Sequence, residues 1–145
     1  MPADVDPDLP GRDDPHRLDV AAVAVVFIGG CAGGLVRYLV TRDWPANVHQ
    51  LPWSVVIVNT AGACVLAVVA SLAIERGWRL RRLLVGTGFC GALTTFSTVV
   101  VGADELVAHD RTGLAAAYVL LTIAAALLAA VLGIAVTRRV IAFRA

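Results

Sequence analysis

The chain has 145 residues, of which 59% are hydrophobic and 16% are charged, and its formal net charge is +1. Its mean hydropathy of +0.80 lies far outside the range of soluble domains, so the chain is predicted to be an integral membrane protein. The nearly neutral charge gives no indication of a nucleic-acid partner.

Residues 1–19 form a polar segment that contains four prolines and six aspartates. A segment with so few apolar residues cannot offset the entropy lost on ordering, so we expect a disordered tail. It is also too acidic to begin a secretory leader. Residues 20–145 are predicted to form one membrane domain with four spans, at about 20–40, 53–74, 83–103 and 114–136.

The first span contains the motif GGCAGGLVRY, which runs from Gly29 to Tyr38. Its two pairs of glycines place a groove on one helix face, where another backbone can approach closely. Arg37 lies inside the apolar run, near its end. Such an arginine either extends its guanidinium to the lipid headgroups or attracts anions at the vestibule of a transport path.

The second span carries one informative polar residue, Asn59, in the motif VNTAG. A lone asparagine in a membrane helix either bonds a neighbouring helix or presents its NH2 group to a permeating anion. The loop that follows, ERGWRLRR at residues 75–82, contains four arginines.

The third span is uncharged between Arg82 and Asp104, and it holds four glycines and several hydroxyl residues. Each internal glycine costs a helix about 1 kcal/mol relative to alanine, and clustered threonines compete for backbone hydrogen bonds. We therefore expect a helix broken at its centre, whose freed backbone groups need partners from protein, ions or water. The alternative is that these small residues only pack against other helices.

The fourth span is rich in alanine and leucine, and Tyr118 and Thr122 share one face of it. Ordinary anchoring at the membrane interface also explains Tyr118. Four spans make a bundle too small to enclose a pore, so a transport path is expected between subunits. The three cysteines lie in three different apolar runs, where we expect protonated packing residues rather than disulfides: Cys31, Cys64 and Cys90.

Three motifs, in this order and on four short spans, resemble the Fluc, or CrcB, family of bacterial fluoride channels: GGCAGGLVRY, VNTAGACVLA and GFCGALTTFST. The resemblance covers roughly residues 25–133. It implies a passive, fluoride-selective channel that confers fluoride resistance. It also implies an antiparallel dimer of oppositely inserted subunits, with two pores along the subunit interface and a structural sodium ion at the centre.

The resemblance assigns roles residue by residue. The sodium ion would be held by the backbone carbonyls of Gly91 and Thr94. Arg37, from its position near the end of the first span, is expected at the vestibule. The implied fluoride path contains Asn59, Phe96, Ser97, Thr98, Val99, Tyr118 and Thr122. Amide and hydroxyl donors replace the water around the anion, and an aromatic ring presents its positive edge.

This chain departs from the family pattern at two pore positions. Val99 stands where the family has a second phenylalanine, and Ala126 occupies a further polar position of the fourth span. Both departures bear on whether each of the two pores conducts.

The arginines are distributed unevenly over the loops. Nine belong to the tail, the second loop and the C-terminus, whereas the other side has three, at Arg37, Arg42 and Arg111. The positive-inside rule then predicts one orientation in the bacterial cell membrane, with both termini in the cytoplasm. A chain that inserts both ways needs a balanced count, so a heterodimer with an oppositely oriented homologue is favoured over a homodimer.

Three other functions compete with a self-sufficient channel. One is a non-conducting or half-conducting partner subunit of a heterodimeric channel, which the two departures favour. Another is a small multidrug exporter, which needs a carboxylate at membrane depth, whereas all eleven acids lie in the tail, loops or span ends. An enzyme has little support, because no histidine lies within a span and no spacing of a nucleophile and a base is found.

Overall fold

A computed structural model describes residues 19–45 and 50–143, except for the side chains of residues 75 and 76. Within these residues the regular structure is helical, with no strand, which confirms the predicted all-α class. Of the N-terminal segment predicted to be disordered, Asp19 is described and residues 1–18 lie outside the described part.

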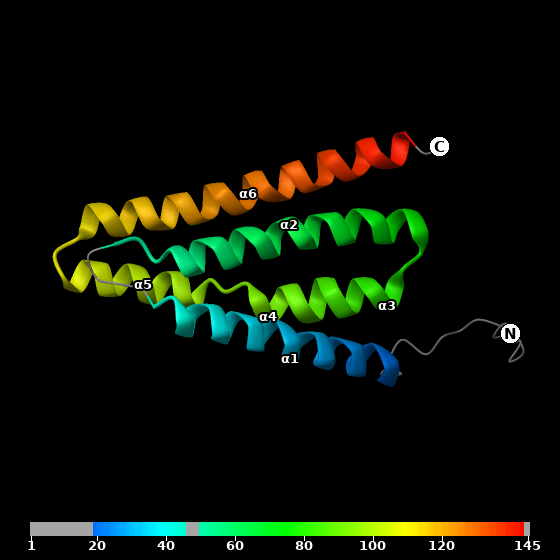
Figure 1. The fold of residues 1–145 in the computed structure, drawn as a ribbon, viewed down its shortest axis with the longest axis horizontal. Helices are drawn as coiled ribbons and strands as arrows, with labels where there is room; N and C mark the ends of the chain where they lie inside the picture. The colour runs from blue at the N-terminus through cyan, green and yellow to red at the C-terminus, as the bar shows by residue number, and fades with distance from the viewer. Residues whose placement is uncertain (1–18, 46–49, 144–145) are drawn as a thin grey trace, which may run out of the picture.

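Four long helical segments lie side by side and are joined by short connections (Figure 1). The first, second and fourth are α1 (Val20–Asp43), α2 (Trp53–Arg76) and α6 (Thr112–Ala142). The third consists of α3 (Arg79–Arg81), the π-helix η1 (Arg82–Cys90), α4 (Gly91–Leu93) and α5 (Ser97–Ala108). All four segments are long and apolar enough to cross a membrane.

The helices extend beyond the apolar spans that the sequence predicts. The third segment runs over Arg79–Ala108, and α6 continues to Ala142. The reason is that charged residues limit the apolar run without ending the helix, because arginine and glutamate have good helix propensities.

The backbone changes conformation between α4 and α5. Thr94 is extended, with φ −80° and ψ 147°, and α5 begins at Ser97. Upstream, η1 has the wider turn of a π-helix over nine residues. π-Helical turns occur frequently at functional sites of proteins, so this part of the chain is a candidate location for a site.

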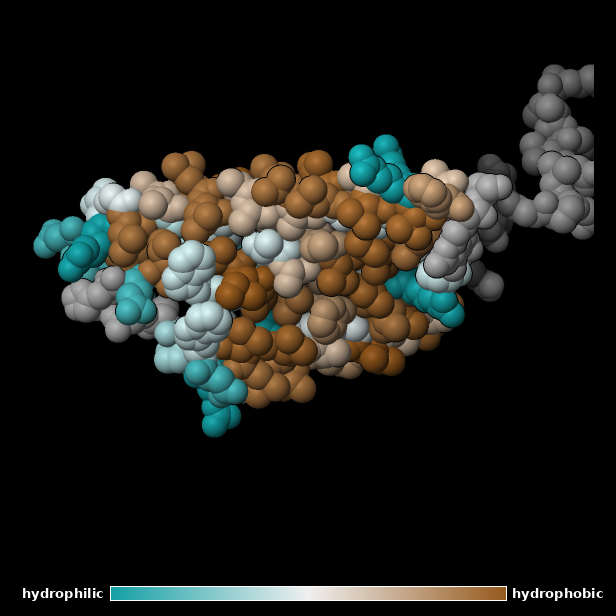
Figure 2. Space-filling model, turned by 45° about the horizontal axis from the view of Figure 1, so that its top comes forward, coloured by the Kyte–Doolittle hydropathy of each residue, from teal (hydrophilic) through white to brown (hydrophobic). Residues whose placement is uncertain are grey.

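The bundle packs in two pairs, α2 against α6 and α1 against η1. A small buried cluster where α2, α5 and α6 meet forms the core, and it consists of Val55, Val56, Val99, Leu106, Ala115 and Tyr118. Many large apolar residues outside it are exposed. Figure 2 shows hydrophobic residues over most of the middle of the bundle and hydrophilic residues mainly near its two ends, as expected for a surface in contact with lipid.

Glycines bring the backbones of α1 and η1 into contact. A Cβ atom added at Gly29 would meet the carbonyl oxygen of Leu84, and one added at Gly33 would meet that of Phe89. From the opposite side, a Cβ at Gly88 would lie 2.6 Å from the carbonyl oxygen of Val26. The predicted groove is therefore confirmed for Gly29 and Gly33.

We predict that Gly33→Ala destabilises the protein by about 1–3 kcal/mol, because the added methyl group must separate α1 from η1. Gly34→Ala is the matched control, since a Cβ there meets nothing within 4 Å. Alanine favours a helix over glycine by about 1 kcal/mol, so the control is expected to be neutral or slightly stabilising. Unfolding transitions of the two purified variants in detergent test this, and equal stabilities would contradict it.

An ion pair joins the start of α1 to α3. The Asp19 carboxylate accepts a hydrogen bond from the Ala22 amide at 3.2 Å, which caps α1. Its other oxygen lies 2.6 Å from a guanidinium nitrogen of Arg79. The hydrogen bond from Arg79, together with that from Ala22, lowers the pKa of Asp19 below its usual value.

Because the folded state lowers the pKa of Asp19, the pair is expected to stabilise the protein above the unfolded-state pKa of about 4. That contribution is lost as the pH falls through the lower pKa of the folded state. Asp19→Asn keeps an acceptor for Ala22 but lacks the charge. We therefore expect the native chain to be more stable than Asp19→Asn at neutral pH and not at strongly acidic pH, and unfolding temperatures across this range measure the difference. A difference independent of pH would contradict the pair.

Candidate functional site

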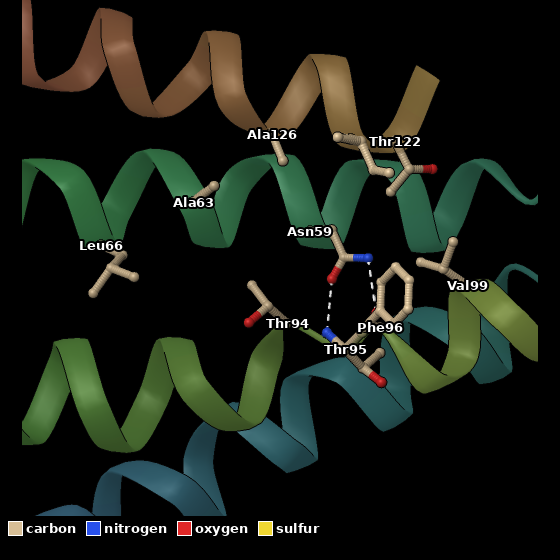
Figure 3. A pocket seen from close by; sticks show the side chains of 10 residues that line it. Asn59, Ala63, Leu66, Thr94, Thr95, Phe96, Val99, Thr122 and Ala126 are labelled. Carbon is tan, nitrogen blue, oxygen red and sulfur yellow. Dashed lines mark hydrogen bonds between the residues drawn. The ribbon is translucent and has the colours of Figure 1, made fainter. Parts of the chain in front are cut away.

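A pocket of about 320 Å³ lies beside the extended segment between α4 and α5 (Figure 3). Its walls come from α2, from residues 94–96, from α5 and from α6. The lining residues are Asn59, Ala63, Leu66, Thr94, Thr95, Phe96, Val99, Thr122, Ile123 and Ala126. Four residues of the predicted fluoride path, on α2, at the start of α5 and on α6, therefore share one pocket, together with Ala126.

Asn59 binds the peptide groups of Thr95 through both ends of its side-chain amide. The Thr95 amide donates to Oδ1 of Asn59 at 2.8 Å, and Nδ2 of Asn59 donates to the Thr95 carbonyl at 3.1 Å. Asn59 is 8% exposed, and burying an unpaired amide is costly. The bond to a neighbouring segment, one of the two alternatives for Asn59, is therefore present. The second hydrogen of Nδ2 remains for another acceptor.

The hydroxyl of Thr95 organises the beginning of α5. Its Oγ1 accepts a hydrogen bond from the Thr98 amide at 3.3 Å. The same oxygen lies 2.9 Å from Oγ of Ser97 and 3.3 Å from Oγ1 of Thr98. Ser97 and Thr98 thus face Thr95 and do not line the pocket. In this conformation their hydroxyls form a separate cluster next to it.

Two carbonyls lose their helical hydrogen-bond donors at this place. In an uninterrupted helix, the Gly91 carbonyl accepts from Thr95 and the Thr94 carbonyl accepts from Thr98. Here these two amides donate instead to the side chains of Asn59 and Thr95. Gly91 is exposed, and a Cβ added there meets nothing within 4 Å. Both carbonyls therefore need other partners, and Gly91 is open to an approaching molecule.

Two of the three threonines that line the pocket, Thr94 and Thr122, donate their hydroxyls to the carbonyl four residues earlier. Thr94 donates to the Cys90 carbonyl at 2.9 Å, and Thr122 donates to the Tyr118 carbonyl at 2.8 Å. A hydroxyl has a single proton, so each must rotate before it can donate into the pocket. The groups that face the pocket without such a rotation are the Asn59 amide and the ring of Phe96, which is 67% exposed.

Other predicted residues lie in different places. Val99 is 1% exposed, and it contributes to both the core cluster and the pocket wall. Tyr118 is fully buried in the core cluster, and its hydroxyl has no hydrogen-bond partner among the described residues. Arg37 is half-buried on α1, away from the pocket lining. The structure thus brings Val99 to the pocket but not Tyr118 or Arg37.

Sequence reasoning did not identify the pairing of Asn59 with Thr95. The usable signal was the predicted break itself, because freed peptide groups at membrane depth need a side chain with both a donor and an acceptor. Asn59 is a polar residue of that kind on α2.

Comparison with known proteins identifies the family. The family model described as CrcB-like protein, camphor resistance, matches residues 24–134. The chain belongs to this family. The resemblance seen in the motifs is thereby confirmed.

Curated relatives of this family member are similar over most of its length. A protein of Mycolicibacterium paratuberculosis named fluoride-specific ion channel FluC 1 is 40% identical over 124 residues, covering 84% of this chain and 94% of its own. A protein of the same name from Cutibacterium acnes is 36% identical over 127 residues, covering 84% of this chain and 89% of its own. A protein of Streptomyces coelicolor, also named fluoride-specific ion channel FluC 1, is 37% identical over 130 residues, covering 88% of this chain and 84% of its own.

Together, the family and the four helices indicate a multi-pass membrane protein. The relatives are named as ion channels and not as enzymes, which confirms the expectation that this family is non-enzymatic.

Replacing Asn59 with the similarly shaped leucine is predicted to destabilise the protein by about 2 kcal/mol, because the half-buried peptide groups of Thr95 lose both partners. Ser71→Ala is the control, since the Ser71 hydroxyl only adds a bond to the Ala67 carbonyl within α2. Unfolding measures the stability, and hydrogen exchange of residues 94–98 measures local opening. Unchanged exchange of the Thr95 amide in Asn59→Leu would contradict the pairing.

Proposed function

We propose that the chain is a subunit of a fluoride-selective channel that lets fluoride leave the cytoplasm passively. The observation that carries the proposal is that Asn59, Phe96 and Thr122, which are far apart in the sequence, line one pocket. Relatives at 36–40% identity are named fluoride-specific ion channels, which supports the choice of the anion. The proposed path includes this pocket, with Arg37 at a vestibule.

The lining of the pocket suits a small anion that must shed water. It carries no carboxylate, so no fixed negative charge repels the ion. The free N–H of Asn59 and the edge of the Phe96 ring supply positive partial charge. Rotation of the Thr94 and Thr122 hydroxyls adds donors when an anion arrives, and the bonds to their own helix carbonyls can re-form when it leaves.

In this proposal the third membrane segment is a broken helix, and the break holds a structural sodium ion. The available oxygen ligands suit a hard cation, because the Gly91 and Thr94 carbonyls have lost their helical hydrogen-bond donors. Gly91 is also open to an approaching molecule. Carbonyl oxygens are suitable ligands for such an ion. When bound, the sodium ion supplies the positive partner that these carbonyls lack.

A second subunit completes the proposed path. The Phe96 ring is largely exposed on the surface of the single chain, where an antiparallel partner covers it and encloses two pores between the subunits. The charges favour one orientation, because the described arginines of the second loop and of the α6 C-terminus lie at the same end of the bundle (Figure 1). By the positive-inside rule, this end and both termini face the cytoplasm.

A half-conducting or non-conducting partner subunit is the second candidate. Val99 and Ala126, the two departures from the family pattern, line the same pocket. A dimer in which this chain's pocket is altered and the pocket of its partner is not would have one working pore. We therefore favour a heterodimer with an oppositely oriented homologue over a homodimer.

Fluoride efflux from liposomes that contain the purified chain, measured beside chloride efflux, tests both candidates. We expect fluoride efflux without chloride efflux once an oppositely oriented homologue is added, because the partner supplies the missing ring and polar group. Efflux from the chain alone would support a self-sufficient homodimer instead. Chloride efflux equal to fluoride efflux, or no flux from folded protein with or without the homologue, would contradict the proposed channel.

A further inference from the structure

Arginines are concentrated at one end of the bundle. We call this set the basic end: Arg79, Arg81, Arg82, Arg138 and Arg139. They come from α3, from the start of η1 and from the C-terminal part of α6, which lie at the same end in Figure 1. All five are exposed, and the side chain of Arg79 is 63% exposed.

Among the described residues, most of these guanidinium groups have no anion beside them. Among the described side chains at this end, Asp19 is the one carboxylate, and Arg79 already pairs with it. Arg81 lies over the ring of Trp78, with 4.4 Å from its Cζ atom to the ring centroid. Stacking uses the face of the guanidinium and leaves the in-plane N–H groups for another acceptor. Arg82, Arg138 and Arg139 form no ion pair with a described residue.

The opposite end has the reverse charge. Its described acids outnumber its described arginines, and the set is Asp43, Asp104, Glu105 and Asp110 beside Arg37, Arg42 and Arg111. Between the two ends the exposed surface is mostly apolar. In a membrane, the apolar surface places the arginines of the basic end at the depth of the lipid headgroups.

We propose that the basic end binds the phosphate groups of anionic phospholipids. Guanidinium groups bind phosphate through two parallel hydrogen bonds, and all twelve basic residues of this chain are arginine. Trp78 fits the same depth, because tryptophan is enriched at membrane interfaces. Arg81 and Arg82 contact such a lipid from the third segment, and Arg138 and Arg139 from α6. This binding does not depend on whether the chain conducts fluoride.

The tryptophans of the chain provide reporters at both ends. Trp78 lies beside Arg81 at the basic end, whereas Trp44 and Trp53 lie at the opposite end and are 51% and 43% exposed. A variant with Trp44→Phe and Trp53→Phe keeps Trp78 alone, and a variant with Trp53→Phe and Trp78→Phe keeps Trp44 alone. Quenching by brominated phosphatidylglycerol or brominated phosphatidylcholine in vesicles then reports which lipid occupies each end.

We expect phosphatidylglycerol to be favoured at Trp78 by about 25-fold or more, since each of the two arginine pairs contributes at least the roughly fivefold factor of one arginine near an anionic surface. No such preference is expected at Trp44. Arg81→Gln with Arg82→Gln, and Arg138→Gln with Arg139→Gln, should each weaken the preference at Trp78 by at least fivefold. Arg42→Gln with Arg111→Gln is the matched control and should leave it unchanged. Circular dichroism verifies that each variant is folded, and the two arginine pairs are tested separately.

Equal quenching of Trp78 by the two lipids would overturn the proposal. So would a preference at Trp78 that survives both pairs of arginine substitutions, or an equal preference at Trp44. Fluoride efflux is not a readout here, so failure of the lipid proposal and failure of the channel proposal remain distinguishable.

Discussion

The paired hydrogen bonds between Asn59 and Thr95 are the interaction on which the site depends. They compensate an interruption of helical bonding that hydrocarbon cannot satisfy. Because the Thr95 amide donates to Asn59, the Gly91 carbonyl loses the donor that it would have in a continuous helix. The Thr98 amide likewise donates to the Thr95 hydroxyl, so the Thr94 carbonyl loses its helical donor. A single asparagine therefore stabilises the extended segment, frees backbone oxygen and faces the pocket.

The glycines of α1 position η1, the part of the third segment that precedes the extended residues. Gly29 and Gly33 allow the backbone of η1 to contact α1, and Gly88 allows the same from the opposite side. α2 and α6 form the second tightly packed pair, in which Gly133 lies against Ala67 and Cys64. The extended residues therefore lie between α4, which contacts α1, and α5, which packs against α6. This arrangement explains how a pocket is maintained in a chain with a small core.

The basic and acidic residues are concentrated at opposite ends of the bundle, and this distribution bears on how the chain lies in a membrane. An excess of arginine at one end and of acid at the other distinguishes the two ends of the bundle, and the proposed orientation follows from this difference by the positive-inside rule. Arg82, Arg138 and Arg139 form no ion pair with a described residue, so the charge on which the proposed orientation rests also leaves donors for the proposed binding of lipid phosphate. Asp19 and Arg79 provide a local exception, because their pair links α1 to α3 at that end.

The four spans and the polar residues that matter could be predicted from the sequence, because uncharged apolar runs and isolated motifs such as VNTAG are local patterns. The arrangement around the pocket could not. Thr94, Thr122 and Tyr118 all carry hydroxyls in the sequence, yet two bond to their own helices and the third is buried in the core. Val99 belongs to both the core and the pocket wall. Hydroxyl direction and burial depend on which helices pack together, so only the tertiary structure decided which predicted residues meet.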